Sequence, residues 1–372
     1  WLWLMLWSSK NIAAMKGLHM LRINRLRQQM AERAIEGIIV SSSPNIYYLS
    51  GFTGTNALLF ITQSKSYLLT DFRYVEQAKL EAPDFEIIKT DKDTYQTMDS
   101  LAEGITTIGV EEQAVTLAQY RQLEKSLSGK VFKEASTILQ EMRQVKDEQE
   151  IEIIKQAIKI TDQAFDLILP DLKLGVREEE ISLKLEYSLR KLGASGKSFD
   201  YIVASGHRAA LPHGVATAKQ IEKGDFVTLD FGAKYQRYCS DFTRTVFIGK
   251  PEAKHREVYD IVLQAQLAAI EVVKPGLTGR EVDAVARELI TKAGYGEYFG
   301  HGLGHSLGLE IHEPPSLNPR EEKVLQPGMV VTIEPGIYLP GWGGVRIEDV
   351  VLVTNTGAEV LTQASKQFII ID

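Results

Sequence analysis

The sequence has little cysteine, no block of basic residues and no long apolar run, and each shortage excludes a class of protein. With Cys239 as its one cysteine among 372 residues, the chain cannot form an internal disulfide, so we expect a reducing compartment, the cytoplasm. The formal net charge of −7 and the lack of a basic block argue against nucleic acid as a partner. The apolar residues 1–7 are too few to cross a bilayer, and no later run approaches that length, so we expect no membrane partner.

The composition, 44% hydrophobic and 24% charged, is that of an ordinary globular protein, and the length favours two domains. Residues 1–19 precede an amphipathic helix that follows Met20. We interpret them as an upstream extension or as residues added for expression, with a short membrane-surface anchor as the alternative. We expect the first domain over 20–140 and the second over 147–372, although no Gly-, Pro- or Ser-rich linker marks the boundary.

The first domain alternates helical and extended patterns, which predicts an α/β fold. A helix is expected over 21–36 because apolar residues recur at helical spacing until Gly37. One long helix is expected over 138–167, across the domain boundary. The other expected elements are helices over 72–82 and 117–127 and strands over 38–40, 57–61, 67–70, 86–88 and 107–110.

The second domain contains an internal repeat. Residues 224–232 and 328–336 both read G-x-x-V-T-aliphatic-acid-x-G, and each segment is followed by a second acid, Asp241 or Glu348. Two predicted helices precede a two-stranded ribbon in each half, so we expect an α+β domain whose halves are related by approximate two-fold symmetry. The expected helices span 148–168, 177–192, 253–273 and 279–293, and the expected strands span 226–233, 238–248, 329–338 and 344–354.

Each ribbon is expected to present a facing pair of carboxylates. A hairpin turning within 233–237 would place Asp230 opposite Asp241, and one turning within 339–344 would place Glu334 opposite Glu348. Facing like charges destabilise a sheet and raise each other's pKa unless a cation lies between them. The alternative, that each acid points to solvent, explains a single acid better than two pairs in a repeated frame.

Three histidines, His301, His305 and His312, fall within a glycine-rich stretch of fourteen residues. The glycines argue against a helix there, and the extended or loop backbone expected instead places His301 and His305 on one side. Four carboxylates and one imidazole suit two adjacent divalent cations, with manganese first and cobalt, zinc or iron next; magnesium is also compatible. Two such cations can polarise a carbonyl and activate water, which is hydrolytic chemistry.

These residues resemble the metallopeptidases of the pita-bread fold, which include methionine aminopeptidase, aminopeptidase P and prolidase. The resemblance covers about residues 147–366. It implies five metal ligands, which carry over to Asp230, Asp241, His305, Glu334 and Glu348. Segments 45–52 and 70–74 also resemble the creatinase/prolidase-type N-terminal domain. That domain points to the branch that cleaves before a proline at the second position of a peptide, and family members are commonly homodimers.

The resemblance also implies roles for residues around the metals. His213 matches a histidine beside the scissile bond, His312 one that assists proton transfer or contacts the substrate, and His301 one that lines the pocket. Arg346 matches an arginine that orients groups near the metals, and Glu334 is the implied general base. One departure is that this chain has His207-Arg208-Ala209 where relatives often have an asparagine.

Two other functions remain open on the same fold. A creatinase-like amidinohydrolase works without metal and would not need all five ligands. A peptide- or histone-binding module without catalysis typically loses ligands and adds charged tails, and this sequence shows neither feature. The sequence does not separate a dipeptidase from an aminopeptidase that accepts longer peptides, nor does it name the native metal.

Overall fold

The computed structural model describes residues 9–90 and 94–372. The chain divides into two compact units, residues 1–142 and 143–372. Residues 1–8 of the expected extension lie outside the described residues, and the rest of it belongs to helix α1 (Ser9–Glu32). Within the described residues, every helix is too short or too polar to span a membrane.

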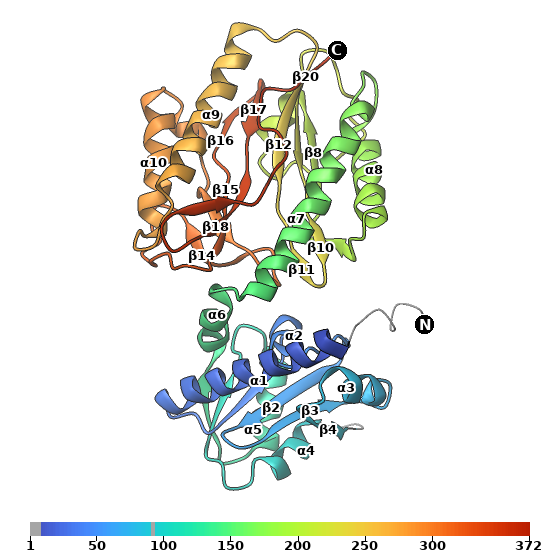
Figure 1. Cartoon of the computed structure of the whole chain (residues 1–372), viewed down its shortest axis with the longest axis vertical. Helices are drawn as coiled ribbons and strands as arrows, with labels where there is room; N and C mark the ends of the chain where they lie inside the picture. The colour runs from blue at the N-terminus through green and yellow to red at the C-terminus, as the bar shows by residue number, and fades with distance from the viewer. Residues whose placement is uncertain (1–8, 91–93) are drawn as a thin grey trace. The chain divides into compact units, whose positions relative to one another are not determined.

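The first unit is an α/β fold around a mixed sheet with the strand order β4-β3-β2-β1-β5-β6. Strand β1 pairs antiparallel with β2 and parallel with β5. Helices α4 and α5 cover one face, where Met98 and Leu123 pack with Ile39 and Phe60 of the sheet (Figure 1). The strands are β1 (Gly37–Val40), β2 (Ala57–Thr62), β3 (Ser66–Thr70), β4 (Glu86–Lys89), β5 (Thr107–Val110) and β6 (Val131–Glu134). The helices after α1 are α2 (Ser43–Ser50), α3 (Val75–Glu81), α4 (Thr94–Leu101), α5 (Leu117–Ser126) and α6 (Ser136–Gln144).

Two predicted helix boundaries are wrong, and each has a local cause. Helix α1 ends at Glu32 instead of residue 36, because Ala34 adopts a left-handed backbone with φ 51° and turns the chain toward β1. The single helix expected over 138–167 is two helices, α6 and α7 (Glu148–Ile168). Asp147 caps α7 in a capping box with Glu150, which stops α6 from continuing.

The second unit consists of two similar halves. Strands β8, β9 and β12 of the first half form an antiparallel set, and β13, β15 and β18 form its counterpart. Figure 1 shows α7 and α8 on one side of these strands and α9 and α10 on the other.

The helices after α7 are α8 (Glu178–Lys191), α9 (Ala253–Val272) and α10 (Gly279–Lys292), with short 3-10 turns η1 (Leu169–Asp171), η2 (Gly206–Ala210) and η3 (Gly296–Tyr298). The strands are β7 (Gly196–Lys197), β8 (Ile202–Ser205), β9 (Phe226–Asp230), β10 (Ala233–Tyr235), β11 (Tyr238–Cys239), β12 (Thr243–Ile248), β13 (Gly304–Ser306), β14 (Glu313–Leu317), β15 (Val330–Ile333), β16 (Gly336–Leu339), β17 (Gly343–Arg346), β18 (Asp349–Val353), β19 (Ala358–Val360) and β20 (Ile370–Ile371).

The alternation of apolar and polar residues in the repeated motif matches the two faces of each strand. In β9, Val227 and Leu229 pack into the core made with α7 and α8. In β15, the equivalent Val331 and Ile333 pack into the core made with α9 and α10. Successive side chains point to opposite faces of a strand, so the threonine and the acid of each motif face away from the helices. The two halves therefore direct their polar residues toward each other.

Candidate metal centre

The four acids of the repeat lie where strands break. Asp230 ends β9, and Asp241 lies in the gap between β11 and β12. Glu334 follows β15, and Glu348 lies between β17 and β18. One carboxylate oxygen from each of Asp230, Asp241 and Glu348 lies within 4.8 Å of the others. The two ribbons therefore converge on one buried cluster of acids.

The predicted register is wrong for the first ribbon and consistent with the second. Asp230 pairs with Thr243, so Asp241 lies two residues away from the position directly opposite it. In the second ribbon, Ile333 pairs with Asp349 and Gly336 with Arg346, and this register places Glu334 opposite Glu348. The two-residue turn of the first hairpin falls at residues 236–237, one position later than expected, because Tyr235 pairs with Tyr238.

His305 brings an imidazole to the same cluster from the second half. It lies on β13, so the expectation of extended backbone is confirmed. Its Nε2 lies 3.5 Å from Asp241 Oδ2 and 3.4 Å from Glu334 Oε1. Its Nδ1 donates to the Ser306 carbonyl at 3.1 Å, which leaves the lone pair of Nε2 directed at the acids. Burial, helped by His312, lowers the pKa of His305 to about 4, so the ring is neutral as a metal ligand requires.

The electrostatics of the cluster call for a cation. Burial raises the pKa of Glu334 to about 7, against the influence of Arg346. Burial and the neighbouring carboxylates raise the pKa of Asp241 and of Glu348 well above the usual range. Asp230 Oδ1 and Glu348 Oε1 are buried and accept no hydrogen bond from any residue that the structure describes. Orphaned carboxylate oxygens beside a neutral imidazole fit divalent metal ions.

Arg346, on β17, connects the acids to His301. Its guanidinium donates to Asp230 and, at 2.8 Å, to the hydroxyl of Tyr338. His301 Nδ1 donates to the Gly302 carbonyl, so its Nε2, at 2.8 Å, accepts from Tyr338. Burial lowers the pKa of His301 to about 4 and raises that of Tyr338 to about 12, so both are neutral. Sequence reasoning missed Tyr338; the signal was a tyrosine on a buried strand, where the hydroxyl needs partners.

His312 and His213 are the exposed histidines of the predicted set. The ring centroid of His312 lies 4.5 Å from that of His305, with the rings nearly perpendicular. His213 lies on the exposed loop after η2. Burial, helped by the neighbouring His213, lowers the pKa of His312, and burial raises the pKa of Asp230 against the influence of Arg346 and His213. Both histidines therefore border the acid cluster from the side that solvent reaches.

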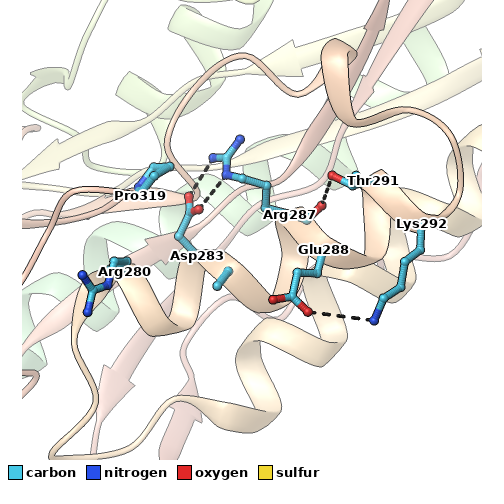
Figure 2. Close-up of a pocket in the computed structure, with 8 residues that line it drawn as sticks. Arg280, Asp283, Arg287, Glu288, Thr291, Lys292 and Pro319 are labelled. Atoms are coloured by element: carbon cyan, nitrogen blue, oxygen red, sulfur yellow. Dashed lines mark hydrogen bonds and ion pairs between the residues drawn. The ribbon is translucent and has the colours of Figure 1, made fainter.

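An ion pair on α10 holds the loop that carries His301. Arg287 makes a bidentate ion pair with Asp283, with contacts of 2.7 and 2.8 Å (Figure 2). The same guanidinium donates to the carbonyls of Phe299 and His301, at 2.9 and 2.7 Å. Asp283, which is 1% exposed, accepts the backbone N–H of Leu303 at 3.0 Å. These contacts fix the backbone on both sides of His301, and sequence reasoning did not identify them.

The chain matches two family models. Residues 152–355 match the model of metallopeptidase family M24, and residues 22–145 match that of the creatinase/prolidase N-terminal domain. An Xaa-Pro dipeptidase from Bacillus anthracis superposes with a TM-score of 0.93 at 47% identity, covering 95% of this chain and 100% of that one. An X-Pro aminopeptidase from Thermotoga maritima gives a TM-score of 0.86 at 42% identity, covering 91% and 99%. An Xaa-Pro dipeptidase of Pyrococcus horikoshii is 41% identical over 94% of this chain and 98% of its own length.

Fold and site together define an enzyme that works with divalent metal ions, a metallopeptidase. Its first unit is a creatinase-type N-terminal domain, and its second unit has the pita-bread fold with an internal repeat, as predicted. The chain belongs to metallopeptidase family M24.

Proposed function

We propose that this enzyme hydrolyses the bond between an N-terminal residue and a following proline, with two divalent metal ions. The observation that carries the proposal is the convergence of three buried acids, the partly buried Glu334 and one neutral imidazole on a single cluster. We assign the ligands as Asp230, Asp241, His305, Glu334 and Glu348. The relatives named Xaa-Pro dipeptidase and X-Pro aminopeptidase support the substrate class.

When bound, the metals would polarise the scissile carbonyl and activate water. Manganese remains the first expectation, with cobalt, zinc and iron as alternatives. Homodimerisation and a cytoplasmic location also remain predictions. A dedicated enzyme is needed because proline lacks an N–H and has a fixed ring, so peptidases that bind substrate backbone as a strand reject it.

The surrounding residues have distinct tasks in this proposal. We assign Glu334, beside the metals, as the general base that exchanges a proton with water. Arg346 holds Asp230 in place from one side. His213 and His312 reach the bound peptide from the exposed side, where they contact the scissile carbonyl and the leaving proline nitrogen. His301, fixed by Tyr338, lines the pocket.

The test is hydrolysis by metal-stripped protein reloaded with one metal at a time. We expect Ala-Pro or Ala-Pro-Gly-Gly to be cleaved before proline, with Ala-Ala and Pro-Ala left intact. Cleavage of the dipeptide alone would define a dipeptidase, and cleavage of both substrates an aminopeptidase. Loaded protein that spares every Xaa-Pro peptide but cleaves Ala-Ala would contradict the proposal. Titration of bound metal should give two ions per chain.

A further inference from the structure

The loop that carries His213 is fastened at its base. It leaves β8 at Ser205, passes through η2 and returns at Thr217. His213 lies near its tip, followed by a tight turn in which the Val215 N–H donates to the His213 carbonyl at 2.9 Å. The position of His213 therefore depends on what holds the two ends of the loop.

Glu178, the first residue of α8, holds both ends. It is fully buried, and one carboxylate oxygen accepts the backbone N–H and the hydroxyl of Ser205 at 2.8 and 2.9 Å. The other oxygen accepts the N–H and the hydroxyl of Thr217 at 3.1 and 2.9 Å. Arg208, from the middle of the loop, forms an ion pair with the same carboxylate. One buried side chain thus joins the beginning, the middle and the end of the loop.

Two cationic side chains, those of Arg208 and Lys219, make further contacts at the ends of this loop. Arg208 donates its other terminal nitrogen to the carbonyl of Val215, two residues after His213, at 2.8 Å. Lys219 donates to the Ser205 hydroxyl at 2.9 Å and to Asp225 at 2.7 Å.

The other side of the loop rests on the strand that carries Arg346. A Cβ on Gly344 of β17 would lie 2.2 Å from the carbonyl oxygen of Ala209, so the absence of a side chain there permits direct backbone contact. Glu178 therefore fixes the loop against β17, two residues before the arginine that binds Asp230.

The second half holds the corresponding place with a carboxylate from a different element. Helix α10 of the second half begins at Gly279, in the place that Glu178 takes at the start of α8. A Cβ on Gly279 would lie 2.3 Å from the Ser316 carbonyl oxygen and 3.1 Å from Glu321 Cβ, so Glu321 packs directly against the start of this helix. The Glu321 carboxylate accepts the backbone N–H groups of Ser316 and Lys323 at 3.2 and 3.0 Å. The residue before each helix makes an equivalent isolated bridge, between Arg177 and Gln220 and between Thr278 and Val324. Both halves therefore have a carboxylate at this place, but the one in the first half comes from the helix and also binds Arg208 of the His213 loop.

We propose that Glu178, together with Arg208, is a positioning residue that sets the placement of His213 relative to the metal centre. The proposal rests on the function proposed above for His213. Glu178 acts through the loop and touches neither the acids nor the substrate. Replacing the Glu178 carboxylate by an amide keeps the shape of the side chain. One carboxylate oxygen becomes an NH2 donor that faces the N–H donor of Ser205 or Thr217, so that end of the loop must move away from residue 178.

The experiment is a double-mutant cycle on the full-length, metal-loaded enzyme with Ala-Pro-Gly-Gly and Ala-Pro as substrates. We expect Glu178→Gln to lower kcat/KM about tenfold in the wild-type background, as for one lost charge-assisted contact. In the His213→Ala background, we expect the same change to alter kcat/KM by less than about twofold, because the group being positioned is gone. Metal content should stay at the wild-type level in every variant.

Matched variants separate positioning from general destabilisation. Asp162→Asn alters another buried carboxylate that accepts two backbone N–H groups, and its effect should be the same with or without His213. Arg208→Lys keeps the positive charge but loses one of the two donor contacts, to Glu178 or to the Val215 carbonyl. If Glu178→Gln fails to fold, Arg208→Lys takes its place in the double-mutant cycle. An equal effect of Glu178→Gln in both backgrounds, or no effect in the wild type, overturns the inference. If His213→Ala itself keeps full activity, the role proposed for His213 fails instead.

Discussion

The two ribbons of the second unit carry the same motif but bring their acids together in different ways. In the second ribbon the register places Glu334 opposite Glu348. In the first ribbon Asp230 is opposite Thr243. Asp241, two residues before Thr243, nevertheless belongs to the acid cluster. By register, Thr243 takes the position in its ribbon that Glu348 takes in the other.

The difference shows how a duplicated strand becomes an asymmetric site. The Thr243 hydroxyl donates to Glu348 at 2.7 Å and accepts from Arg346 at 3.2 Å. A neutral donor thus stands where a symmetric repeat would place another acid, which removes one repulsive contact and orients a carboxylate. The two ribbons thus share a motif but differ in the residue opposite its acid, which is threonine in one ribbon and glutamate in the other.

The largest predicted effect comes from removing one acid of either ribbon. Asp241→Ala or Glu348→Gln should lower kcat at least about a thousandfold, because each change removes a proposed metal ligand. Bound metal, measured by elemental analysis, should fall with activity while circular dichroism stays near wild type. Glu359→Gln, an exposed acid on β19, is the control. Full activity in Asp241→Ala would eliminate the two-metal assignment.

A smaller effect is expected from the residue in which the ribbons differ. Thr243→Val keeps the shape but removes the hydroxyl between Glu348 and Arg346. We expect kcat/KM to fall about ten- to a hundredfold and metal to dissociate more readily, as for a lost supporting contact. Thr362→Val removes a buried hydroxyl that accepts the Val350 N–H, and it should leave metal affinity unchanged. Equal metal affinities in the two variants would argue against a role for Thr243 in the site.

The loop of the second half offers a milder perturbation. Arg287→Met removes the fork onto Asp283 and the donors to the carbonyls of Phe299 and His301. We expect kcat/KM to fall about tenfold with metal content unchanged, because a misplaced pocket residue weakens substrate orientation. Arg280→Met, at an exposed arginine near the start of the same helix, should behave as wild type (Figure 2).

The smallest predicted effect concerns the metal-free protein and leaves activity aside. Because burial raises the pKa of Glu334 to about 7, the folded metal-free state binds a proton that the unfolded chain releases near its ordinary pKa. This contribution to stability is present at low pH and is lost as the pH rises through about 7. The melting temperature should therefore fall by several degrees from pH 5 to pH 8, and Glu334→Gln should flatten the slope. A rise over this range in metal-free protein would contradict the burial argument.

Much of the fold followed from local pattern, because apolar periodicity locates helices and strands directly. The break between α6 and α7 was also encoded, in the capping box of Asp147 and Glu150, but the helical pattern on both sides concealed it. Helices α2 and α4 and strand β6 were not predicted. They are short, and tertiary packing outweighs propensity in short elements.

The acids of the site were predictable because a carboxylate on a buried strand is costly without a reason. The glycines around His305 disfavoured a helix, which was enough to predict its non-helical backbone. The structure adds a reason for one of these glycines, because a Cβ on Gly304 would lie 2.0 Å from the Thr332 carbonyl oxygen. The offset of Asp241 was not predictable, because a one-residue difference in a hairpin turn shifts every pairing. Tyr338 and Asp283 act through contacts distant in sequence, which a local pattern does not reveal.

The bridge between Thr243 and Glu348 has a consequence for biosynthesis. The two residues are 105 positions apart along the chain, yet their backbones and side chains meet directly at the acid cluster. While the ribosome is still adding the second ribbon, Asp230 and Asp241 have no partners with which to enclose a cation. At the proposed site, metal capture would therefore be a late event for a nascent chain, and we expect a truncated chain that ends before β17 to be unable to complete it.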